Sequence, residues 1–492
     1  MTSRFDRSLL RDPRLLRTDL FIDGQWSSGG LGSRVDVVDP ATGAVIGSMA
    51  QANADDVHHA IAVASAAWPE WAAKPAFERA RVLRRWYDLV VDNADDLALI
   101  LTAEQGKPLA EARGEILYGA GFIEWFAEEA KRLYGEVIPT NHPNRRLVTV
   151  RQPVGVTAAI TPWNFPSAMI LRKAAPALAA GCAMIVKPAD ETPLSATALA
   201  ELAQRAGLPS GLLSVVSGKA EMVGEILTSS STVRTLSFTG STPVGKLLMR
   251  QSASNVKRVA LELGGNAPLI VFDDADLDAA VAGAMASKFR NAGQTCVCAN
   301  RIIVQSGIHD AFVARLSEAV ESLVVGNGFD TDTTQGPLIS DDAVVKVESH
   351  ISDAVAAGAK VVTGGDRHEL GRTYFQPTVL TDVTNSMLVA REETFGPLAP
   401  VIRFDDEEQA LAIANDTEFG LAAYFFTRDL ARTWRFGEAL EFGVVGINTG
   451  LISYEGAPFG GVKESGLGRE GSRHGVDEFT EIKYLCIDGI TN

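Results

Sequence analysis

The sequence of 492 residues contains little cysteine and no long hydrophobic segment. Its four cysteines, Cys182, Cys296, Cys298 and Cys486, are too few for a disulfide framework and are typical of a protein in a reducing compartment. Cys296 and Cys298 form a CxC pair without a second Cys or His pair nearby, so we expect no metal site. A run of about 18 apolar residues, which a transmembrane helix needs, does not occur.

The N-terminal segment does not have the pattern of a secretory signal peptide. It alternates charged residues with leucine and has no apolar stretch of about 7–15 residues, which a signal peptide requires. Basic residues are also in deficit, because 45 Lys and Arg stand against 61 Asp and Glu, a net charge of −16. This balance argues against binding to nucleic acid or to an anionic membrane. We therefore expect a cytoplasmic protein that binds neither, while small-molecule ligands remain open because local charge decides their binding.

The composition is that of a globular protein. Hydrophobic residues make up 46% and charged residues 22%, which excludes a disordered or collagen-like chain. The length corresponds to roughly three domains at about 150 residues each.

The N-terminal part of the chain has the apolar spacing of helices. Asp55–Ala67, Phe77–Leu101 and Pro108–Leu133 each repeat apolar residues at intervals of three and four. We expect Pro69 to end the first of these helices. Residues 135–153 combine central turn residues with an alternating Leu-Val-Thr-Val run, which predicts a hairpin or an extended arm.

From Val154 onwards, short apolar runs alternate with helical segments. This order predicts a parallel sheet with helices on its faces. A second series begins near residue 260, with strands predicted at Ala260–Leu263 and Pro268–Phe272. Phe479–Ile487 is apolar enough to form a last strand. The predicted fold class is therefore α/β, with two α/β domains.

Two loops that join a strand to a helix attract attention. Thr161–Pro166 (TPWNFP) would lie at the carboxyl end of a strand, where open α/β sheets bind ligands, and the Asn164 amide could donate to an oxyanion. The simpler interpretation is a rigid turn made by two prolines. Phe238–Gly245 has small residues that would let backbone N–H groups and a helix N-terminus face a phosphate. It is not a GxGxxG motif and is by itself a weak dinucleotide signal, so an ordinary strand-to-helix turn explains it better.

Two further segments carry reactive side chains. Glu262 lies in an apolar run before two glycines, and a buried carboxylate has a raised pKa that suits a general base near neutral pH. An exposed glutamate on a strand is the simpler alternative. Cys296 follows a predicted helix in a loop with Gly and Gln, where a thiol would be accessible as a nucleophile. Most cysteines, however, are small buried hydrophobic residues.

Taken together, these segments resemble the aldehyde dehydrogenase superfamily along nearly the whole chain. Their order and separations fit that family. The segments that carry the resemblance are Thr161–Pro166, Lys187-Pro188, Phe238–Gly245, Leu261–Gly265, Gly293–Cys296 and Glu392–Pro397. Within the superfamily, the chain is most similar to succinate-semialdehyde dehydrogenases over Phe289–Ala299, Glu393–Ala399, Asn415–Tyr424 and Pro458–Gly471.

The resemblance implies a catalytic role for three residues. Cys296 would be the nucleophile that attacks the aldehyde carbon, and the Asn164 amide and the Cys296 backbone N–H would hold the oxyanion. Hydride loss to a nicotinamide would leave a thioester, and Glu262 would activate the water that hydrolyses it. Covalent capture makes chemical sense, because it converts a poor hydride donor into a thiohemiacetal alkoxide, which is a good one.

The resemblance also implies a dinucleotide site. The matching residues are Trp163, Lys187, Asp190, Gly240, Ser241, Gly245, Glu393 and Phe395. Asp190 differs from the small neutral residue of the NADP-preferring relatives. Because a carboxylate accepts a hydrogen bond from a free 2′-hydroxyl and repels a 2′-phosphate, we expect NAD to be preferred over NADP.

For the substrate, Arg172 and Arg290 match positions that bind a distal carboxylate, with Ser453 as a third donor. An arginine clamps a carboxylate with two hydrogen bonds, although a surface ion pair is its commoner role. The implied substrate is succinic semialdehyde in 4-aminobutyrate breakdown, with glutaric semialdehyde as the close alternative. In some relatives a Cys296–Cys298 disulfide acts as a redox switch; Cys298 could equally be a neighbour without a role.

The implied architecture has three parts. Residues 16–134 and 154–261 would form a dinucleotide-binding domain, residues 262–460 a catalytic domain, and residues 135–153 with 478–490 an oligomerisation element, giving a homodimer or homotetramer.

Two other classes of function stay open. The first is a thioesterase or ester hydrolase, which would use the same cysteine and glutamate without a cofactor. The second is a structural relative without activity, and the presence of Cys296, Glu262 and Asn164 together argues against it.

Overall fold

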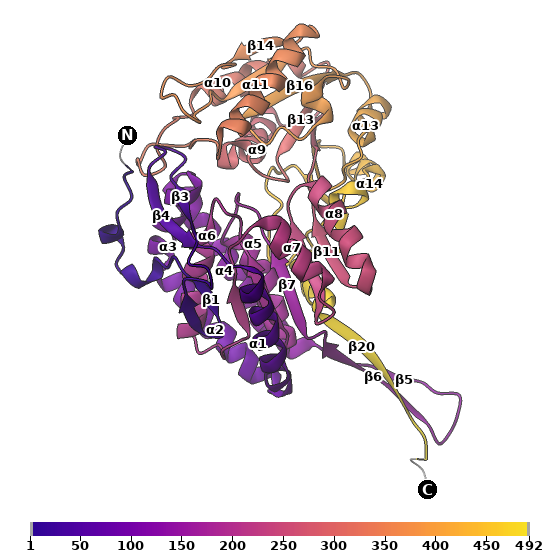
Figure 1. Ribbon diagram of the computed structural model, residues 1–492. Coiled ribbons are helices and arrows are strands. Elements are labelled where there is room, and N and C mark those ends of the chain that lie inside the picture. The colour runs from indigo at the N-terminus through magenta and orange to yellow at the C-terminus, as the bar shows by residue number, and fades with distance from the viewer. Residues whose placement is uncertain (1–2, 490–492) are drawn as a thin grey trace.

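The first sheet has eight strands, and five of them run parallel at its centre. The computed structural model describes residues 3–489, and this sheet forms the lower lobe in Figure 1. In spatial order the strands are β19 (Gly466–Leu467), β11 (Arg258–Glu262), β10 (Val233–Thr239), β7 (Val156–Ile160), β8 (Ala183–Lys187), β9 (Leu213–Val215), β1 (Leu20–Ile22) and β2 (Gln25–Ser27). Every residue of β8 is buried, which is typical of a strand in the middle of a parallel sheet.

The second sheet has seven strands and forms the upper lobe in Figure 1. Its strands are, in spatial order, β14 (Lys360–Thr363), β15 (Thr378–Thr381), β16 (Leu398–Phe404), β13 (Ala299–Gln305), β12 (Ala267–Val271), β17 (Ala422–Phe426) and β18 (Val444–Ile447). All are parallel except β14, which pairs antiparallel with β15. The predicted α/β class with two Rossmann-like parallel sheets is confirmed.

The strand that we expected to open the second series belongs to the first sheet instead. Strand β11 pairs in parallel with β10, from Arg258 opposite Thr235 to Glu262 opposite Thr239. The chain reaches β11 from β10 through helix α8 (Thr242–Ser252), and such a β-α-β connection returns to the same sheet. Glu262 therefore lies at the same sheet edge as the Thr161–Pro166 and Phe238–Gly245 loops.

A three-stranded antiparallel sheet projects from the lower lobe as an arm (Figure 1). It consists of β5 (Val137–Ile138), β6 (Arg146–Pro153) and β20 (Thr480–Ile487). Strands β6 and β20 pair along their whole lengths, although they are more than 300 residues apart in sequence. The predicted arm and the predicted last strand are both confirmed, while residue 490 of the predicted element lies outside the described residues.

Helices cover the sheets of both lobes, and within residues 3–489 none is long and apolar enough to cross a membrane. The helices of the lower lobe are α1 (Ala54–Ala73), α2 (Ala76–Asp92), α3 (Ala94–Gln105), α4 (Leu109–Glu129), α5 (Ala168–Ala180), α6 (Pro193–Arg205), α7 (Ala220–Ser229) and α8. Those of the upper lobe are α9 (Leu277–Lys288), α10 (His309–Glu321), α11 (Asp341–Ala356), α12 (Leu388–Arg391), α13 (Glu407–Asn415) and α14 (Leu430–Ala439). A separate hairpin joins β3 (Arg34–Val38) to β4 (Val45–Ala50).

Helix α1 continues through Pro69 to Ala73, so the predicted helix end at Pro69 is wrong. A proline near the end of a helix removes one backbone hydrogen bond. The next turn offsets this loss, because Trp71 is only 1% exposed and its indole Nε1 donates to the Leu178 carbonyl at 2.9 Å. Tertiary packing thus extends the helix beyond its local stop signal.

Four parallel strands of the first sheet bring their carboxyl ends to one edge. Strand β7 leads into the Thr161–Pro166 loop, β8 ends at Lys187, β10 leads to Ser241, and β11 ends at Glu262. This is the edge at which open α/β sheets bind ligands. The fold therefore gathers the predicted loops, which are up to about one hundred residues apart, at a single place.

Candidate active site

Cys296 lies where two cavities meet, because its side chain lines one cavity of about 260 Å³ and another of about 310 Å³. We call the first the edge cavity; its lining includes Trp163, Gly240, Ser241, Glu393 and Phe395. We call the second the α4 cavity; its lining includes Glu111, Tyr118, Arg172, Arg290 and Ser453. The residues predicted for cofactor and for substrate thus lie mainly on opposite sides of one thiol.

The segment before Cys296 is a strained turn. The 3₁₀ turn η5 (Arg290–Gly293) contains two non-glycine residues in the left-handed region, Asn291 with φ 51° and Ala292 with φ 53°. Such strain persists only where the surroundings hold it, and it is common at functional sites. The turn presents the Cys296 side chain at the junction of the two cavities.

The Cys296 thiol is half-buried and uncharged at neutral pH. Burial raises its pKa to about 12, although the positive charge of Arg172 lowers it. A thiolate is the reactive form. Attack on a carbonyl therefore has to be coupled to removal of the thiol proton.

Asn164 is positioned as a hydrogen-bond donor beside this thiol. The residue is 3% exposed, and its Nδ2 donates to the backbone carbonyl of Gln294 at 3.0 Å. Its Oδ1 accepts from the backbone N–H of Phe165 at 3.1 Å. This hydrogen bond fixes the orientation of the amide group, so that its N–H groups lie on the other side. Because Nδ2 carries two hydrogens, one remains for a developing oxyanion near Cys296.

Glu262 is a buried carboxylate without a hydrogen-bond partner. It is 3% exposed, and neither Oε1 nor Oε2 accepts a hydrogen bond from the described residues. Burial, together with the negative charge of Glu470, raises the pKa of Glu262 to about 8. Such a group is poised to exchange a proton near neutral pH, as a general base requires. The simpler alternative, an exposed glutamate on a strand, is wrong.

Glu393 and Phe395 close the edge cavity from the upper lobe. One oxygen of Glu393 accepts from the backbone N–H of Gly265 at 3.1 Å, and its own backbone carbonyl accepts from Lys346 Nζ. Burial raises the pKa of Glu393 to about 7. Phe395 has φ 57° and packs edge-on against Trp163, with ring centroids 5.5 Å apart. The two lobes therefore meet across this cavity.

The opposite wall of the edge cavity has the features of a phosphate site. Ser241 is the N-cap of helix α8 and makes no side-chain capping bond, so the helix N-terminus is open towards the cavity. The neighbouring Thr239 Oγ1 is buried without a hydrogen-bond partner. Gly245 packs where a Cβ would lie 2.4 Å from the Leu263 side chain. These residues fit a dinucleotide.

Lys187 and Asp190 lie beside the edge cavity but do not line it. Lys187 ends strand β8, and its Nζ donates to Asp190 Oδ1 at 2.9 Å and to the Pro188 carbonyl at 3.0 Å. The Asp190 side chain is 43% exposed. Its carboxylate is thus held by a buried lysine and still reaches solvent, as a ribose hydroxyl partner would have to.

The two arginines of the α4 cavity differ in their partners. Arg172 is 2% exposed, forms an ion pair with the buried Glu470, and has its guanidinium 4.6 Å from the Phe459 ring centroid. Arg290 is half-buried and stacks over Phe165 at 5.3 Å, and among residues 3–489 no carboxylate lies within ion-pair distance of it. Arg290 therefore has no ion-pair partner among the described residues, although the Glu111 carboxylate of the same cavity interacts with it electrostatically, whereas Arg172 is paired directly with Glu470.

Sequence reasoning missed several residues of this site. Glu111, Glu115 and Tyr118 line the α4 cavity from helix α4, and Glu470 reaches it through its ion pair with Arg172. Positions 111, 115 and 118 are spaced by four and three, so they share one face of the helix. That spacing was visible in the sequence, but nothing in it tells whether the face points to solvent or to a cavity.

Cys298 points away from the two cavities. Its thiol is buried and lies 3.2 Å from Lys288 Nζ, which donates to it. Lys288 is itself fully buried at the end of helix α9. The redox role implied for Cys298 stays a prediction, and it would require the Cys298 side chain to turn from Lys288 towards Cys296.

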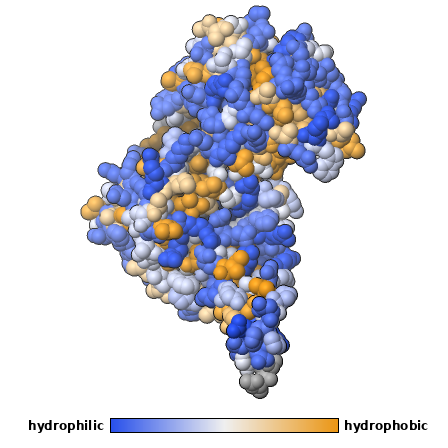
Figure 2. All heavy atoms as spheres, turned by 90° about the vertical axis from the view of Figure 1, so that its right-hand side faces the viewer, coloured by the Kyte–Doolittle hydropathy of each residue, from blue (hydrophilic) through white to orange (hydrophobic). Residues whose placement is uncertain are grey.

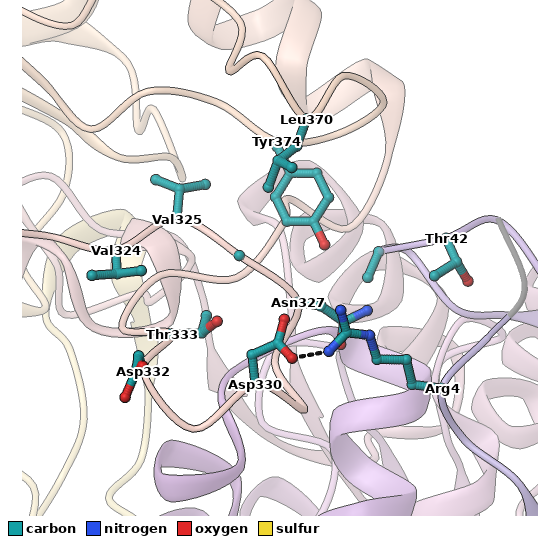
Figure 3. A pocket seen from close by; sticks show the side chains of 12 residues that line it. Arg4, Thr42, Val324, Val325, Asn327, Asp330, Asp332, Thr333, Leu370 and Tyr374 are labelled. Atoms are coloured by element: carbon teal, nitrogen blue, oxygen red, sulfur yellow. Dashed lines mark ion pairs between the residues drawn. The ribbon is translucent and has the colours of Figure 1, made fainter.

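A third cavity, of about 560 Å³, contains none of the predicted residues. It lies between the N-terminal segment and the upper lobe, and Figure 3 shows the ion pair between Arg4 and Asp330 across its floor with the Tyr374 ring above. No nucleophile or general base of the proposed chemistry lies there. Cys296 and most of the residues predicted for cofactor and substrate therefore line the other two cavities.

Comparison with known proteins agrees with this geometry. The model of the aldehyde dehydrogenase family matches residues 26–485. A glutarate-semialdehyde dehydrogenase of Pseudomonas aeruginosa is 60% identical over 98% of this chain and 100% of its own, and an NADP(+) succinate-semialdehyde dehydrogenase of Escherichia coli is 60% identical over 97% and 99%. The crystal structure of a succinate-semialdehyde dehydrogenase from Burkholderia pseudomallei matches with a TM-score of 0.97 at 60% identity, covering 98% of this chain and 100% of that one.

The match thus spans nearly the whole chain and its relatives' whole length. The family match includes the parallel strands of the first sheet, the whole second sheet, most of the arm and every segment that carries the predicted site. The chain belongs to the aldehyde dehydrogenase family, whose members oxidise aldehydes with NAD or NADP.

Proposed function

We propose that this protein oxidises an aldehyde with a distal carboxylate, succinic semialdehyde, to the dicarboxylate succinate. The observation that carries the proposal is the guanidinium of Arg290, which has no ion-pair partner among the described residues, in the α4 cavity that shares Cys296 with the edge cavity. Ser453 adds a hydroxyl to the same cavity, and Arg172 adds positive charge. A relative named for this substrate and one named for glutarate semialdehyde are equally similar. Glutaric semialdehyde is the close alternative, because one methylene discriminates by only about 1–3 kcal/mol.

The catalytic steps follow from the contacts at Cys296. With the aldehyde in the α4 cavity, the Cys296 thiol gives up its proton to solvent as its sulfur attacks the carbonyl carbon, and the Asn164 Nδ2–H and the Cys296 backbone N–H donate to the oxyanion. Collapse of this oxyanion would expel a hydride and leave a thioester on Cys296. A nicotinamide dinucleotide held by the edge cavity would supply the hydride acceptor. Glu262 then takes a proton from the water that hydrolyses the thioester on Cys296.

A substrate comparison tests the proposal. We expect kcat/KM to be higher for succinic and glutaric semialdehyde than for acetaldehyde or betaine aldehyde, because only the first two offer a carboxylate to Arg290. Arg290→Ala should lower kcat/KM for succinic semialdehyde about 10–100-fold, mainly through KM, since a hydrogen bond to a charged group contributes about 1.5–3 kcal/mol. Initial rates of reduced-cofactor formation give both values.

The matched control is an uncharged aldehyde of similar length, such as butanal. Arg290→Ala should change kcat/KM for butanal less than about threefold, because no charged group is lost from that complex. Arg290→Lys keeps the charge without the planar fork and should fall between the wild type and the alanine variant. Equal losses on the charged and the uncharged aldehyde would rule out Arg290 as the carboxylate partner.

For the cofactor, we propose that NAD is preferred over NADP. Support comes from the Asp190 carboxylate beside Lys187, because it repels a 2′-phosphate. We expect kcat/KM to be at least about tenfold higher with NAD, and Asp190→Ser to reduce that ratio. Glu191→Ser, which removes the exposed neighbouring carboxylate, is the matched control and should leave the ratio unchanged. A tenfold preference of the wild type for NADP would contradict the proposal, and one relative is named for NADP(+).

We also propose that the arm joins two copies of the chain in a homodimer or homotetramer. Strand β20 is the outer strand of its sheet, and Ile482, Tyr484 and Ile487 on it are exposed. Such an open apolar edge is costly in water unless another strand covers it. Figure 2 shows further hydrophobic groups interspersed on this face between the upper lobe and the arm. The oligomerisation element proposed at residues 135–153 and 478–490 rests on these features.

A hydrolase that works without a cofactor remains the rival from a different class. It would use Cys296 and Glu262 on an ester or thioester, and the open N-terminus of helix α8 in the edge cavity would then have no ligand to bind. The edge cavity therefore favours the dehydrogenase.

A further inference from the structure

Asn291 makes hydrogen bonds to parts of the chain that lie far apart in sequence. The residue is 2% exposed. Its Nδ2 donates to the backbone carbonyls of Asn164 at 3.0 Å and of Gln294 at 3.3 Å. Its Oδ1 accepts from Gln105 Nε2 at 3.0 Å, and its backbone N–H donates to the Glu111 carboxylate at 2.9 Å. The side chain of Asn291 thus uses all its polar atoms.

These bonds cross the boundary between the two lobes. Gln105 ends helix α3 and Glu111 lies in α4, both in the lower lobe, whereas Asn291 follows helix α9 of the upper lobe. The Asn164 carbonyl also accepts from the buried Lys107 Nζ at 2.8 Å, so both of its lone pairs are used. The backbone of the catalytic amide is therefore held from both lobes.

The carbonyl of Gln294 connects Asn291 to the chemistry. This oxygen accepts from Asn164 Nδ2 at 3.0 Å as well as from Asn291 Nδ2. Because the amide group is planar, committing one N–H of Asn164 to this oxygen fixes the direction of the other N–H. The place of the Gln294 carbonyl thus decides where the oxyanion donor points, and Gln294 is only two residues from Cys296.

The backbone conformation explains why asparagine stands at this position. Asn291 has φ 51°, a left-handed conformation that Asn adopts more readily than most other residues. Ala292 and Gly293 continue in the same region, with φ 53° and 76°. The bonds of the Asn291 side chain hold this turn in place, as such strain requires.

We infer that Asn291 is a positioning residue for the oxyanion site: it aligns the Asn164 amide with Cys296 by holding the Asn164 and Gln294 carbonyls together. The inference rests on the proposed role of Asn164 as an oxyanion donor. Asn291 lines neither the edge cavity nor the α4 cavity, and it acts only through Asn164. A residue that merely stabilised the loop would act independently of Asn164.

A double-mutant cycle separates these two roles. Asn291→Asp keeps the shape, the left-handed preference and the acceptor for Gln105, but it removes both donor bonds and turns an acceptor towards two carbonyls. We expect the single-turnover rate of reduced-cofactor formation to fall about 10–100-fold, part of the about 10²–10³-fold loss expected for Asn164→Ala. In the Asn164→Ala background, Asn291→Asp should cost less than about threefold, because residues that act as one unit are not additive.

Asn300→Asp is the matched control for the cycle. Asn300 is also 2% exposed, and its Nδ2 donates to the carbonyls of Val389 and Glu392 without contacting Asn164. Any loss that Asn300→Asp causes should be the same factor in both backgrounds. Asn291→Gly, which adopts a positive φ without strain, replaces Asn291→Asp if the aspartate variant does not fold, as judged by thermal unfolding.

Each outcome decides the inference. An equal loss from Asn291→Asp in both backgrounds, or no loss in the wild type, overturns the role of Asn291 and leaves the proposed function intact. If Asn164→Ala itself retains the wild-type single-turnover rate, the oxyanion role in the proposed function fails, and the inference fails with it.

Discussion

Cys296→Ser is expected to lower kcat for aldehyde oxidation by about 10⁴-fold or more, the order found when a covalent nucleophile is removed. The serine hydroxyl is a much weaker nucleophile than a thiolate. Without the covalent adduct the bound aldehyde remains a poor hydride donor. The measurement is the initial rate of reduced-cofactor formation from succinic semialdehyde.

Two controls accompany this experiment. Quenching of tryptophan fluorescence by NAD should persist in Cys296→Ser, because Trp163 and the N-terminus of helix α8 in the edge cavity are unchanged. Cys486→Ser, which replaces an exposed cysteine on the arm, should retain the wild-type rate. If Cys296→Ser kept more than a tenth of the wild-type kcat, the covalent mechanism would be wrong.

Glu262→Gln is expected to let the first turnover proceed and to stop the second. The glutamine keeps the size of the side chain but cannot take a proton from water, so the thioester on Cys296 should accumulate. We expect a burst of about one reduced cofactor per active site, followed by a steady-state rate about 10²–10⁴-fold below the wild type, the usual contribution of a general base. Stopped-flow absorbance resolves the burst, and mass spectrometry detects the acyl adduct.

The pH dependence of the wild type provides a second test of Glu262. Burial and the charge of Glu470 raise its pKa to about 8, and only the deprotonated carboxylate acts as a base. Where hydrolysis limits turnover, kcat should therefore rise with pH and level off above about 8. Glu262→Gln should lack this rise.

Glu104→Gln is a matched control for both measurements. Burial also raises the pKa of Glu104 to about 8, but its oxygens accept from the backbone N–H groups of Leu194 and Ser195, and it lines neither the edge cavity nor the α4 cavity. Its substitution should leave the ratio of burst to steady-state rate unchanged. Loss of steady-state turnover without a burst in Glu262→Gln would assign Glu262 to an earlier step.

Local patterns predicted several segments that the structure brings together near Cys296, because these residues lie in short loops and strand ends with a recognisable composition. The Thr161–Pro166 loop, the segment before Cys296 and the strand that ends at Glu262 were all recognisable from neighbouring residues alone. Local stop signals were less reliable. Pro69 predicts the end of a helix, yet the burial of Trp71 two residues later carries helix α1 onwards.

Pairing between distant segments could not be predicted in the same way. Strand β11 looked like the start of a second sheet, and only its pairing with β10 assigns Glu262 to the first. Helix α4 showed a face with Glu111, Glu115 and Tyr118, but periodicity does not tell what a face packs against. Likewise, the different environments of the two arginines became clear only from Glu470, which lies 298 residues after Arg172 and forms an ion pair with it.

The sequence by itself determined the fold class and the family, and it predicted roles for Cys296, Glu262 and Asn164 through its resemblance to that family, because each of these depends on a few consecutive residues or on the order of short segments. Only the tertiary structure decided that one thiol opens to two cavities, that Arg172 and not Arg290 is paired with Glu470, and that Asn291 holds the catalytic amide in place. These properties depend on distances between residues from both lobes. Such distances are set by packing and strand pairing across the whole chain, and no local pattern encodes them.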